Sequence, residues 1–399
     1  MKRLLLLSFA LVLLAGLCFA EPVEIKVWHY WGGFEAVPFQ AVIDGFNASQ
    51  NKAHAVAQYL PREELNRQYT IGLAGGNLPD IAMVDNPDHA SYAAMGLFLD
   101  ITDRVKAWEG NGKFFEGPWL SCTYQGKVYG VPQNSNCLAL YYNVDMLKAA
   151  GVNPPATWDE LAAAAKKLTK PGVYALAISA IGNEEGTFQY LPWLLSSGAT
   201  ITKLDSPESV KSLTFLTNLV KNGFMSSEVI NWTQADAEKQ FATGRAAMMV
   251  NGPWNLQAVQ TDAPNMNWYL AKIPKDKKYT SVLGGENMGI TATSQYPNEA
   301  WAFLKYMSGT SVMETYMTTS GKFPPRSDVM NGSDFWKSDR LLKVFADQMQ
   351  YAMPRGPHPR WPDISNAIST ALQEALSKTK TPAQALKDAQ GKVTKALSN

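Results

Sequence analysis

Residues 126–161 of this 399-residue chain constrain its fold more than any other stretch. Two segments within it, residues 127–131 and 138–142, have the β-branched and aromatic content of strands. The connector between them, residues 133–136, has the sequence Gln-Asn-Ser-Asn, which offers hydrogen-bonding groups and little apolar surface. Such a connector suits a wet cleft better than a hydrophobic core. The stretch therefore predicts an α/β protein whose chain crosses a cleft at this connector.

Periodicity and turn residues predict strands and helices along the rest of the chain. Thr157 followed by Glu160 is the pattern of a capping box, so a helix is expected to begin there. We expect residues 183–190, NEEGTFQY, to form a loop that combines adjacent acids with aromatic residues. Strands are expected at residues 24–27, 56–59, 80–84, 174–179 and 246–250, and helices at residues 39–46, 62–73, 297–307, 363–377 and 382–397.

Residues 1–20 have the pattern of a signal peptide. Two basic residues precede an apolar run, residues 4–17, which is too short to span a bilayer as a stable helix. Cys18 leaves lipid attachment open, but Leu17 is large where a lipid-attachment motif has a small residue, so release after Ala20 is preferred. We therefore expect an exported protein, periplasmic or at the cell surface, with a lipid-anchored form through Cys18 as the alternative.

The charge balance argues against nucleic acid and anionic lipid as partners. Without the two basic residues of the signal peptide, 34 basic residues face 35 acidic ones. The length suggests two domains. Cys122 and Cys137 remain after cleavage, and whether they form a disulfide stays open, because sequence does not give the distance between them.

Catalytic and metal-binding motifs are absent from the sequence. It has no HExxH, phosphate-binding loop, GxGxxG or Gly-x-Ser-x-Gly motif, and its four histidines lack metal-ligand spacing. We therefore expect no enzyme activity, no metal and no cofactor. A secreted glycosidase and a structural or adhesion protein stay open as alternatives. Adjacent Glu184 and Glu185 do not provide the two carboxyls facing each other across a substrate that glycoside hydrolysis needs.

A set of motifs occurs in a fixed order along almost the whole chain. Besides YGVP and LYYN in the stretch above, these are GGNLPDI at 75–81, FATGRAAMMVNGPW at 241–254, VLGGENMGI at 282–290, PNEAWAFLKYM at 297–307 and TPAQALKDAQ at 381–390. The ordered set resembles the extracellular solute-binding proteins of ABC importers, in the carbohydrate-binding group that includes the maltose-binding protein.

The resemblance implies a two-lobed α/β fold of the periplasmic-binding-protein type II, with three crossings between the lobes near Gln133, Gly284 and Arg326. It implies a signal peptide at 1–20, an N-terminal lobe of residues 21–134 and 285–326, and a C-terminal lobe of residues 135–284 and 327–399. It also implies a monomer that captures a sugar by hinge closure and delivers it to a membrane ABC permease.

Ligand-binding residues are expected where strands end, since the carboxyl ends of strands form the ligand crevice of α/β sheets. Aromatic rings would stack on the apolar faces of a sugar, and planar polar groups would bind its hydroxyls. The candidates are His29, Tyr30, Trp31, Glu63, Asp85, Ser135, Asn136, Phe188, Trp254, Gly285, Glu286, Arg355 and Trp361.

The resemblance is incomplete at two places. The segment VDNPDH after Met83 lacks the aromatic-plus-Asp-Arg arrangement of the maltose-binding protein, so maltodextrin specificity is not implied. The Asn134-Ser135-Asn136 connector resembles that of glycerol-phosphate and glycerophosphodiester binders in the same group. Arg355 and Arg360 could contact a phosphate, or both could be surface residues whose charge is solvated by water.

Overall fold

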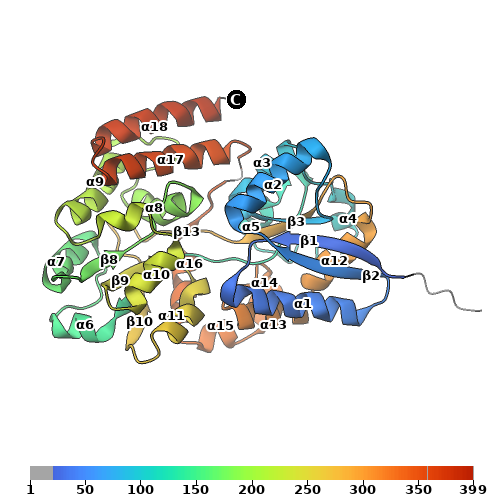
Figure 1. The fold of residues 1–399 in the computed structure, drawn as a ribbon, viewed down its shortest axis with the longest axis horizontal. Helices are drawn as coiled ribbons and strands as arrows, with labels where there is room; N and C mark the ends of the chain where they lie inside the picture. The colour runs from blue at the N-terminus through green and yellow to red at the C-terminus, as the bar shows by residue number, and fades with distance from the viewer. Residues whose placement is uncertain (1–20, 357, 399) are drawn as a thin grey trace, which may run out of the picture.

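The computed structural model describes residues 21–356 and 358–398. The expected signal peptide and Cys18 lie outside these residues. Two separate β-sheets, each flanked by helices, form the two lobes of the molecule (Figure 1). Among the described helices, none is long and apolar enough to cross a membrane.

The sheet of the first lobe has five strands in the order β2-β1-β3-β12-β6. The first three are parallel to one another, and β12 is antiparallel to both of its neighbours. Both faces of this sheet are covered, so its central strands are buried along most of their length. The strands are β1 (Val23–His29), β2 (Ala53–Tyr59), β3 (Ile81–Asp85), β6 (Val131–Pro132) and β12 (Glu286–Ile290).

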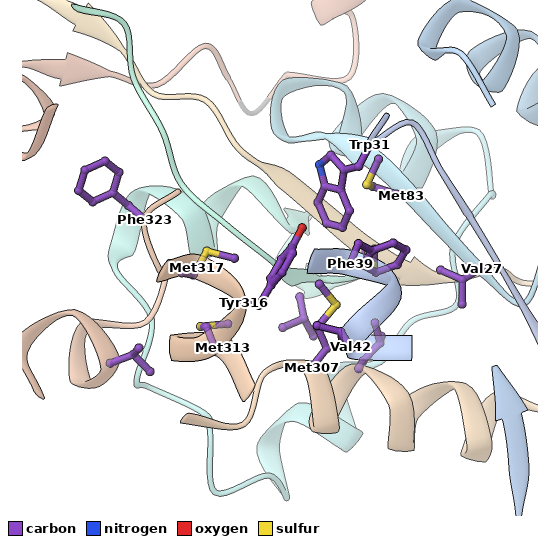
Figure 2. Packing of buried hydrophobic residues seen from close by; sticks show 14 of the residues in the cluster. Val27, Trp31, Phe39, Val42, Met83, Met307, Met313, Tyr316, Met317 and Phe323 are labelled. Atoms are coloured by element: carbon purple, nitrogen blue, oxygen red, sulfur yellow. The ribbon is translucent and has the colours of Figure 1, made fainter. Parts of the chain in front are cut away.

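The helices of the first lobe divide between the two faces of its sheet (Figure 1). One face carries α1 (Ala36–Ser49), α12 (Pro297–Met307) and α13 (Thr310–Ser320), and the other carries α2 (Arg62–Gly75) and α3 (His89–Ala94). At the first face, Trp31 packs edge-on against Phe39 with ring centroids 4.9 Å apart, and Tyr316 lies 5.6 Å from Trp31 (Figure 2). Shorter elements complete this lobe: η1 (Gly33–Glu35), η2 (Asn86–Asp88), α4 (Thr102–Lys106), α5 (Glu116–Ser121), β4 (Thr123–Tyr124) and β5 (Lys127–Val128). The short helix α14 (Ser327–Gly332) follows the third crossing.

The sheet of the second lobe has four strands in the order β10-β7-β9-β8. They are β7 (Ala139–Asn143), β8 (Tyr174–Ala177), β9 (Ala246–Asn251) and β10 (Trp268–Ala271). One face packs on α7 (Trp158–Leu168), α8 (Glu184–Ser196), α9 (Pro207–Lys221), α17 (Trp361–Leu376) and α18 (Pro382–Leu397). The other face packs on α10 (Gln234–Ala242), α11 (Leu256–Asp262) and α16 (Leu342–Met349). The remaining elements are α6 (Val144–Ala149), η3 (Ser227–Ile230), η4 (Pro253–Asn255), β11 (Ser281–Val282), α15 (Phe335–Ser338) and β13 (Ala352–Met353).

The chain crosses between the lobes three times, and the three crossings lie side by side. The amide of Ser135 donates to the carbonyl of Phe323 at 2.8 Å, and the amide of Asn136 donates to the carbonyl of Gly284 at 3.0 Å. Gly285 has φ +139°, and a Cβ there would lie 2.2 Å from the carbonyl oxygen of Asn134, so this position requires glycine. The predicted two-lobed α/β fold with three crossings is thus confirmed.

Three local expectations need correction. Residues 183–190 form no loop: Asn183 caps α8 by accepting a hydrogen bond from the Glu185 amide at 2.9 Å, and the helix runs on from Glu184. The predicted capping box at Thr157 is incomplete, because the Glu160 carboxylate accepts from the Ala156 amide instead. The expected strand at 127–131 is split into β5 and β6.

The two cysteines of the described chain are both buried and free. Cys122 follows α5, and Cys137 lies at the start of the path into β7. Burial raises the pKa of the Cys137 thiol above its usual range, although Ser281 offsets part of the effect. The disulfide that the sequence left open is therefore not formed.

Candidate functional site

A cavity of about 220 Å³ lies between the two lobes, beside the crossing segments. Seven of its fourteen lining residues carry ionisable acidic or basic side chains, so it is a polar site and not a gap in the core. The lining residues are Tyr30, Glu35, Arg62, Asp85, Asn136, Glu185, Phe188, Gln234, Trp254, Gly284, Gly285, Glu286, Lys322 and Arg355.

Two strand ends of the first sheet bring acidic side chains to this cavity. Asp85 is the last residue of β3, and Glu286, the first residue of antiparallel β12, pairs directly with it. Tyr30 follows β1, which runs parallel to β3 and ends at the same edge of the sheet. The hydroxyl of Tyr30 donates to Glu286 at 3.4 Å. The cavity therefore lies at the carboxyl ends of parallel strands, where α/β sheets bind ligands.

Arg355 joins the two lobes inside the cleft. Its guanidinium donates to both oxygens of Asp85, at 2.8 and 2.9 Å, and its Nη1 lies 2.5 Å from Glu184 at the start of α8. Arg62, at the start of α2, approaches the same Asp85 carboxylate at 2.5 Å. Burial alone would raise the pKa of Asp85, but Arg355 and Arg62 outweigh it and hold that pKa below its usual value. Asp85 is therefore ionised and shared by two guanidinium groups.

Lys322 is the third cation of the cavity, and it too is already paired. Its side chain is 1% exposed, and Nζ lies 2.5 Å from Glu35 and 3.4 Å from Glu286. The same ammonium group lies 4.8 Å from the centre of the Trp31 ring, within the range of a cation–π contact. Burial lowers the pKa of Lys322, but Glu286 and Glu35 raise it by more. Burial raises the pKa of Glu35, an effect that Lys322 partly offsets.

The second lobe contributes aromatic surface. Phe188 on α8 lies under the Arg355 guanidinium, whose Cζ is 4.5 Å from the ring centre. Half-buried Trp254, just after β9, has its ring 6.2 Å from that of Phe188. A Cβ on Gly252 would lie 2.0 Å from the Trp254 ring, so the indole rests on bare main chain. Glu185 accepts a hydrogen bond from the Gln234 amide at 3.0 Å and thereby joins α8 to α10.

Comparison with known proteins identifies the family. A family model described as bacterial extracellular solute-binding protein matches residues 41–344. The chain belongs to this family. The family resemblance expected from the ordered motifs is thereby confirmed, and the family's members bind and transport substrates.

This solute-binding protein is similar to several characterised relatives. It is 25% identical to a maltotriose-binding protein of Pyrococcus abyssi, over 88% of this chain and 78% of the relative. An ABC transporter solute-binding protein from Thermotoga lettingae, solved with α-D-tagatose, is 29% identical with a TM-score of 0.87, over 94% of this chain and all of that one. The maltose-bound MalE3 of Thermotoga maritima is 24% identical with a TM-score of 0.85, over 93% and 99% of the two chains. At 24% identity, the similarity to MalE3 supports the fold alone.

The cavity between the lobes brings together most of the residues that the sequence suggested. Eight of the thirteen candidates line the cavity: Tyr30, Asp85, Asn136, Phe188, Trp254, Gly285, Glu286 and Arg355. Five do not: His29, Trp31, Glu63, Ser135 and Trp361.

The five exceptions have clear structural positions. Trp31 and Trp361 are both 0% exposed, so neither ring offers a face to a ligand, and Trp361 donates to Glu184 from inside the second core. His29 is enclosed by aromatic rings, and burial lowers its pKa to about 4 despite a hydrogen bond with the Trp31 main chain. Ser135 is buried in the crossing, and exposed Glu63 accepts from Asn183 across the lobes.

Six residues of the cavity were missed: Glu35, Arg62, Glu185, Gln234, Gly284 and Lys322. A usable signal existed for Glu35 and Arg62, which lie just before α1 and at the start of α2, directly after strands β1 and β2. Lys322 lies between α13 and α14 with no local pattern to mark it. No cluster of three or more potential metal ligands occurs among the residues that the structure describes.

Proposed function

We propose that this protein binds a neutral sugar in the cleft between its lobes and delivers it to a membrane ABC permease. The observation that carries the proposal is the charge state of the cavity. Each of its three cations already has a carboxylate partner at 2.5–2.9 Å, and the fourth acidic group, Glu185, adds negative charge. An anionic ligand would meet four carboxylates and would have to displace one of them from a buried cation. A neutral ligand meets no such cost.

The remaining chemistry of the cavity suits hydroxyl groups and an apolar ring face. Asn136, Gln234 and the carboxylates offer planar donors and acceptors for hydroxyls. Half-buried Trp254 offers an aromatic face for C–H groups, whereas Phe188 is 5% exposed and has Arg355 over its ring. The α-D-tagatose of the Thermotoga lettingae protein and the maltotriose in the name of the Pyrococcus relative support a sugar as the ligand class.

The volume of the cavity favours a small sugar. Pockets that enclose drug-sized ligands have roughly 300–1,000 Å³, and about 220 Å³ is below that range. We infer that one sugar ring occupies the enclosed cavity.

The transport cycle rests on movement of the lobes about the three crossings. We propose the boundaries 21–134 with 285–326 for one lobe and 135–284 with 327–399 for the other, closing on the ligand by hinge rotation. Export, by cleavage after residue 20 or with a lipid on Cys18, would place a monomer beside its permease. Small-angle scattering checks the closure: the radius of gyration should fall when the correct sugar saturates the protein. An unchanged radius at saturation counts against hinge closure.

The ligand class is tested by calorimetric titration of the mature chain. Neutral mono- and disaccharides should include at least one that binds, whereas glycerol 3-phosphate and glycerophosphocholine should not. Tight binding of either phosphate compound and of none of the sugars would refute the proposal. Incubating the bound sugar or its glycosides with micromolar protein should leave them intact, and hydrolysis would favour the glycosidase alternative.

A further inference from the structure

A second and larger hollow opens next to the proposed sugar cavity. It has a volume of about 1030 Å³ and lies between α1 and α13 of the first lobe and α11, α15 and α16 of the second. Figure 1 shows these helices together below the crossing segments. Glu35 and Trp254 line both hollows, so the two spaces meet at these side chains. We call this second hollow the side groove.

The side groove differs from the sugar cavity in chemistry. Of its 25 lining residues only Glu35 and Asp339 are charged, within the part of the chain that the structure describes, against seven of fourteen in the sugar cavity. Its walls include half-exposed Phe34, strongly exposed Val37 and the half-buried face of Val312. A second sugar ring would need planar polar partners, and these make up four of the 25 residues that line the side groove, Glu35, Gln257, Gln260 and Asp339, against eight of fourteen in the sugar cavity. An apolar group would remove the exposed hydrophobic surface from water.

Tyr316 adds aromatic surface to the side groove. Tyr316 lines the groove, is 2% exposed, and its hydroxyl makes no hydrogen bond with any residue that the structure describes. Its ring packs against Trp31, and its oxygen is on the side of Trp31 (Figure 2). Because Trp31 is 0% exposed and does not line the groove, the hydroxyl faces the core, and Tyr316 presents ring carbons to the groove.

We propose that the ligand is a glycoside, with its sugar ring in the small polar cavity and an aromatic aglycone in the side groove. This inference rests on the proposed sugar-binding function and adds the chemical class of the substituent. The glycosidic bond would pass between Glu35 and Trp254, the residues common to both spaces. About 1030 Å³ is ample for an aryl group, since whole drug-sized ligands occupy pockets of roughly 300–1,000 Å³.

Matched pairs of ligands test the proposal. The mature chain is titrated calorimetrically with methyl and p-nitrophenyl glycosides of the same sugars in the same anomeric form. For the sugar that binds, the p-nitrophenyl glycoside should bind at least about tenfold more tightly, because the ring buries apolar surface in the groove. Equal affinities would overturn the inference. The inference would also be overturned if a disaccharide bound more tightly than the methyl glycoside by as much as the aryl glycoside does, because the groove would then accept a second sugar ring.

Two variants on one helix locate the effect. Thr315 is exposed and lines the side groove, whereas its neighbour Glu314 is exposed and does not. Thr315→Trp should narrow the groove and reduce the affinity advantage of the aryl glycoside over the methyl glycoside, while leaving the methyl glycoside affinity unchanged. Glu314→Trp should change neither. If the aryl glycoside exceeds the methyl glycoside in affinity by the same factor in Thr315→Trp as in wild type, the groove is refuted as the binding site of the aryl group.

Free p-nitrophenol separates this inference from the proposed function. If no methyl glycoside binds, the sugar assignment fails. The groove is still supported if p-nitrophenol at millimolar concentration binds wild type and Glu314→Trp but not Thr315→Trp. If p-nitrophenol also fails to bind, or binds all three chains alike, the aromatic groove fails as well.

Discussion

Trp254 is the residue whose replacement best separates a binding role from a structural one. Trp254 follows β9, and its indole rests on the main chain of Gly252. The ring centre is 6.2 Å from that of Phe188, and the side chain is only half-buried in the free protein. Trp254→Ala removes an aromatic face from both the sugar cavity and the side groove. Because part of the ring is already in contact with water, truncation leaves no closed hole of its full volume in the core.

The expected size of the effect on affinity follows from this position. An aromatic side chain that becomes desolvated on binding contributes about 2 kcal/mol or more at a hot spot. This corresponds to a loss of affinity of at least about thirtyfold, since about 1.4 kcal/mol is tenfold. Stability should fall by less than the roughly 3–5 kcal/mol typical of a buried Trp→Ala change. Calorimetric titration with the best sugar and urea unfolding of the same samples measure both quantities.

Trp193→Ala is the matched control. Trp193 is 0% exposed inside the second core and is absent from the cavity lining, so its loss should cost about 3–5 kcal/mol of unfolding free energy. Its effect on the affinity of the remaining folded protein should be small. A folded Trp254→Ala protein with wild-type affinity would refute the binding role, and destabilisation equal to that of Trp193→Ala would assign Trp254 to the core.

Three further predictions concern stability, each measured as the free energy of urea unfolding. Arg355→Met removes one of the two cations that pair with Asp85 and the ion-pair partner of Glu184, and it should cost about 3 kcal/mol. Arg360→Met, at an exposed ion pair, should cost about 1 kcal/mol or less, and equal costs would contradict the buried network. Burial lowers the pKa of His89 to about 3, and the nearby main chain of Tyr129 offsets part of this effect, so the unfolded chain takes up a proton below about pH 6.5 while the folded chain does not. Between pH 7 and pH 5 the free energy of unfolding of wild type should therefore fall by about 2 kcal/mol more than that of His89→Gln. A difference between the two proteins that does not change with pH would refute this prediction. Gly285→Ala should lower the free energy of unfolding by more than about 1 kcal/mol, because the φ of Gly285 is +139° and a Cβ there would meet main chain. Gly391→Ala, in open space on α18, should leave the stability unchanged or raise it. The reverse order of the two effects would contradict the backbone conformation at Gly285.

The architecture was predictable because its signals are local. The polar connector at 133–136 is framed by strand patterns, and the structure has a crossing there, bonded to the second and third crossings. Asp85 was also predictable, since it follows an expected strand, and the carboxyl ends of strands define the crevice. Glu286 was expected beside the second crossing, without the strand β12 that begins there. Register itself was not predicted; the sheet pairs these two residues directly.

The aromatic candidates show where the sequence is ambiguous. Tyr30 and Trp31 are adjacent after β1, and neighbouring residues of extended chain point in opposite directions. Tyr30 faces the cavity, while Trp31 is enclosed by α1 and α13. Trp361 is the first residue of α17, and whether its ring turns outward depends on Glu184, to which it donates from a distant part of the chain. Composition near a strand or helix end does not decide such orientations.

The charged network was beyond prediction because its members are far apart in sequence. Arg355 and Asp85 are separated by 270 residues, and Lys322 and Glu286 by 36 with two helices between them. Phosphate binding was left open by the sequence because the connector at 134–136 resembles that of glycerol-phosphate binders and because Arg355 and Arg360 could contact a phosphate. The structure provides a partner for Arg355: the Asp85 carboxylate, held by two nitrogens at 2.8 and 2.9 Å, occupies the place that a phosphate would need.

The position of Arg355 also bears on how the lobes separate. The residue lies after β13, and its guanidinium binds Glu184 at the start of α8 and Asp85 at the end of β3, so it belongs to the second lobe and reaches the first. Opening the cleft must part Arg355 from Asp85. While the cleft is closed, that separation would leave buried charges unpaired, which is costly; once water enters, both groups are solvated and most of the cost disappears. Intermediate, half-open arrangements are therefore the least favourable. The ion pair thus favours two distinct states of the lobes, and a sugar needs only to bind the closed one more tightly to shift the balance between them.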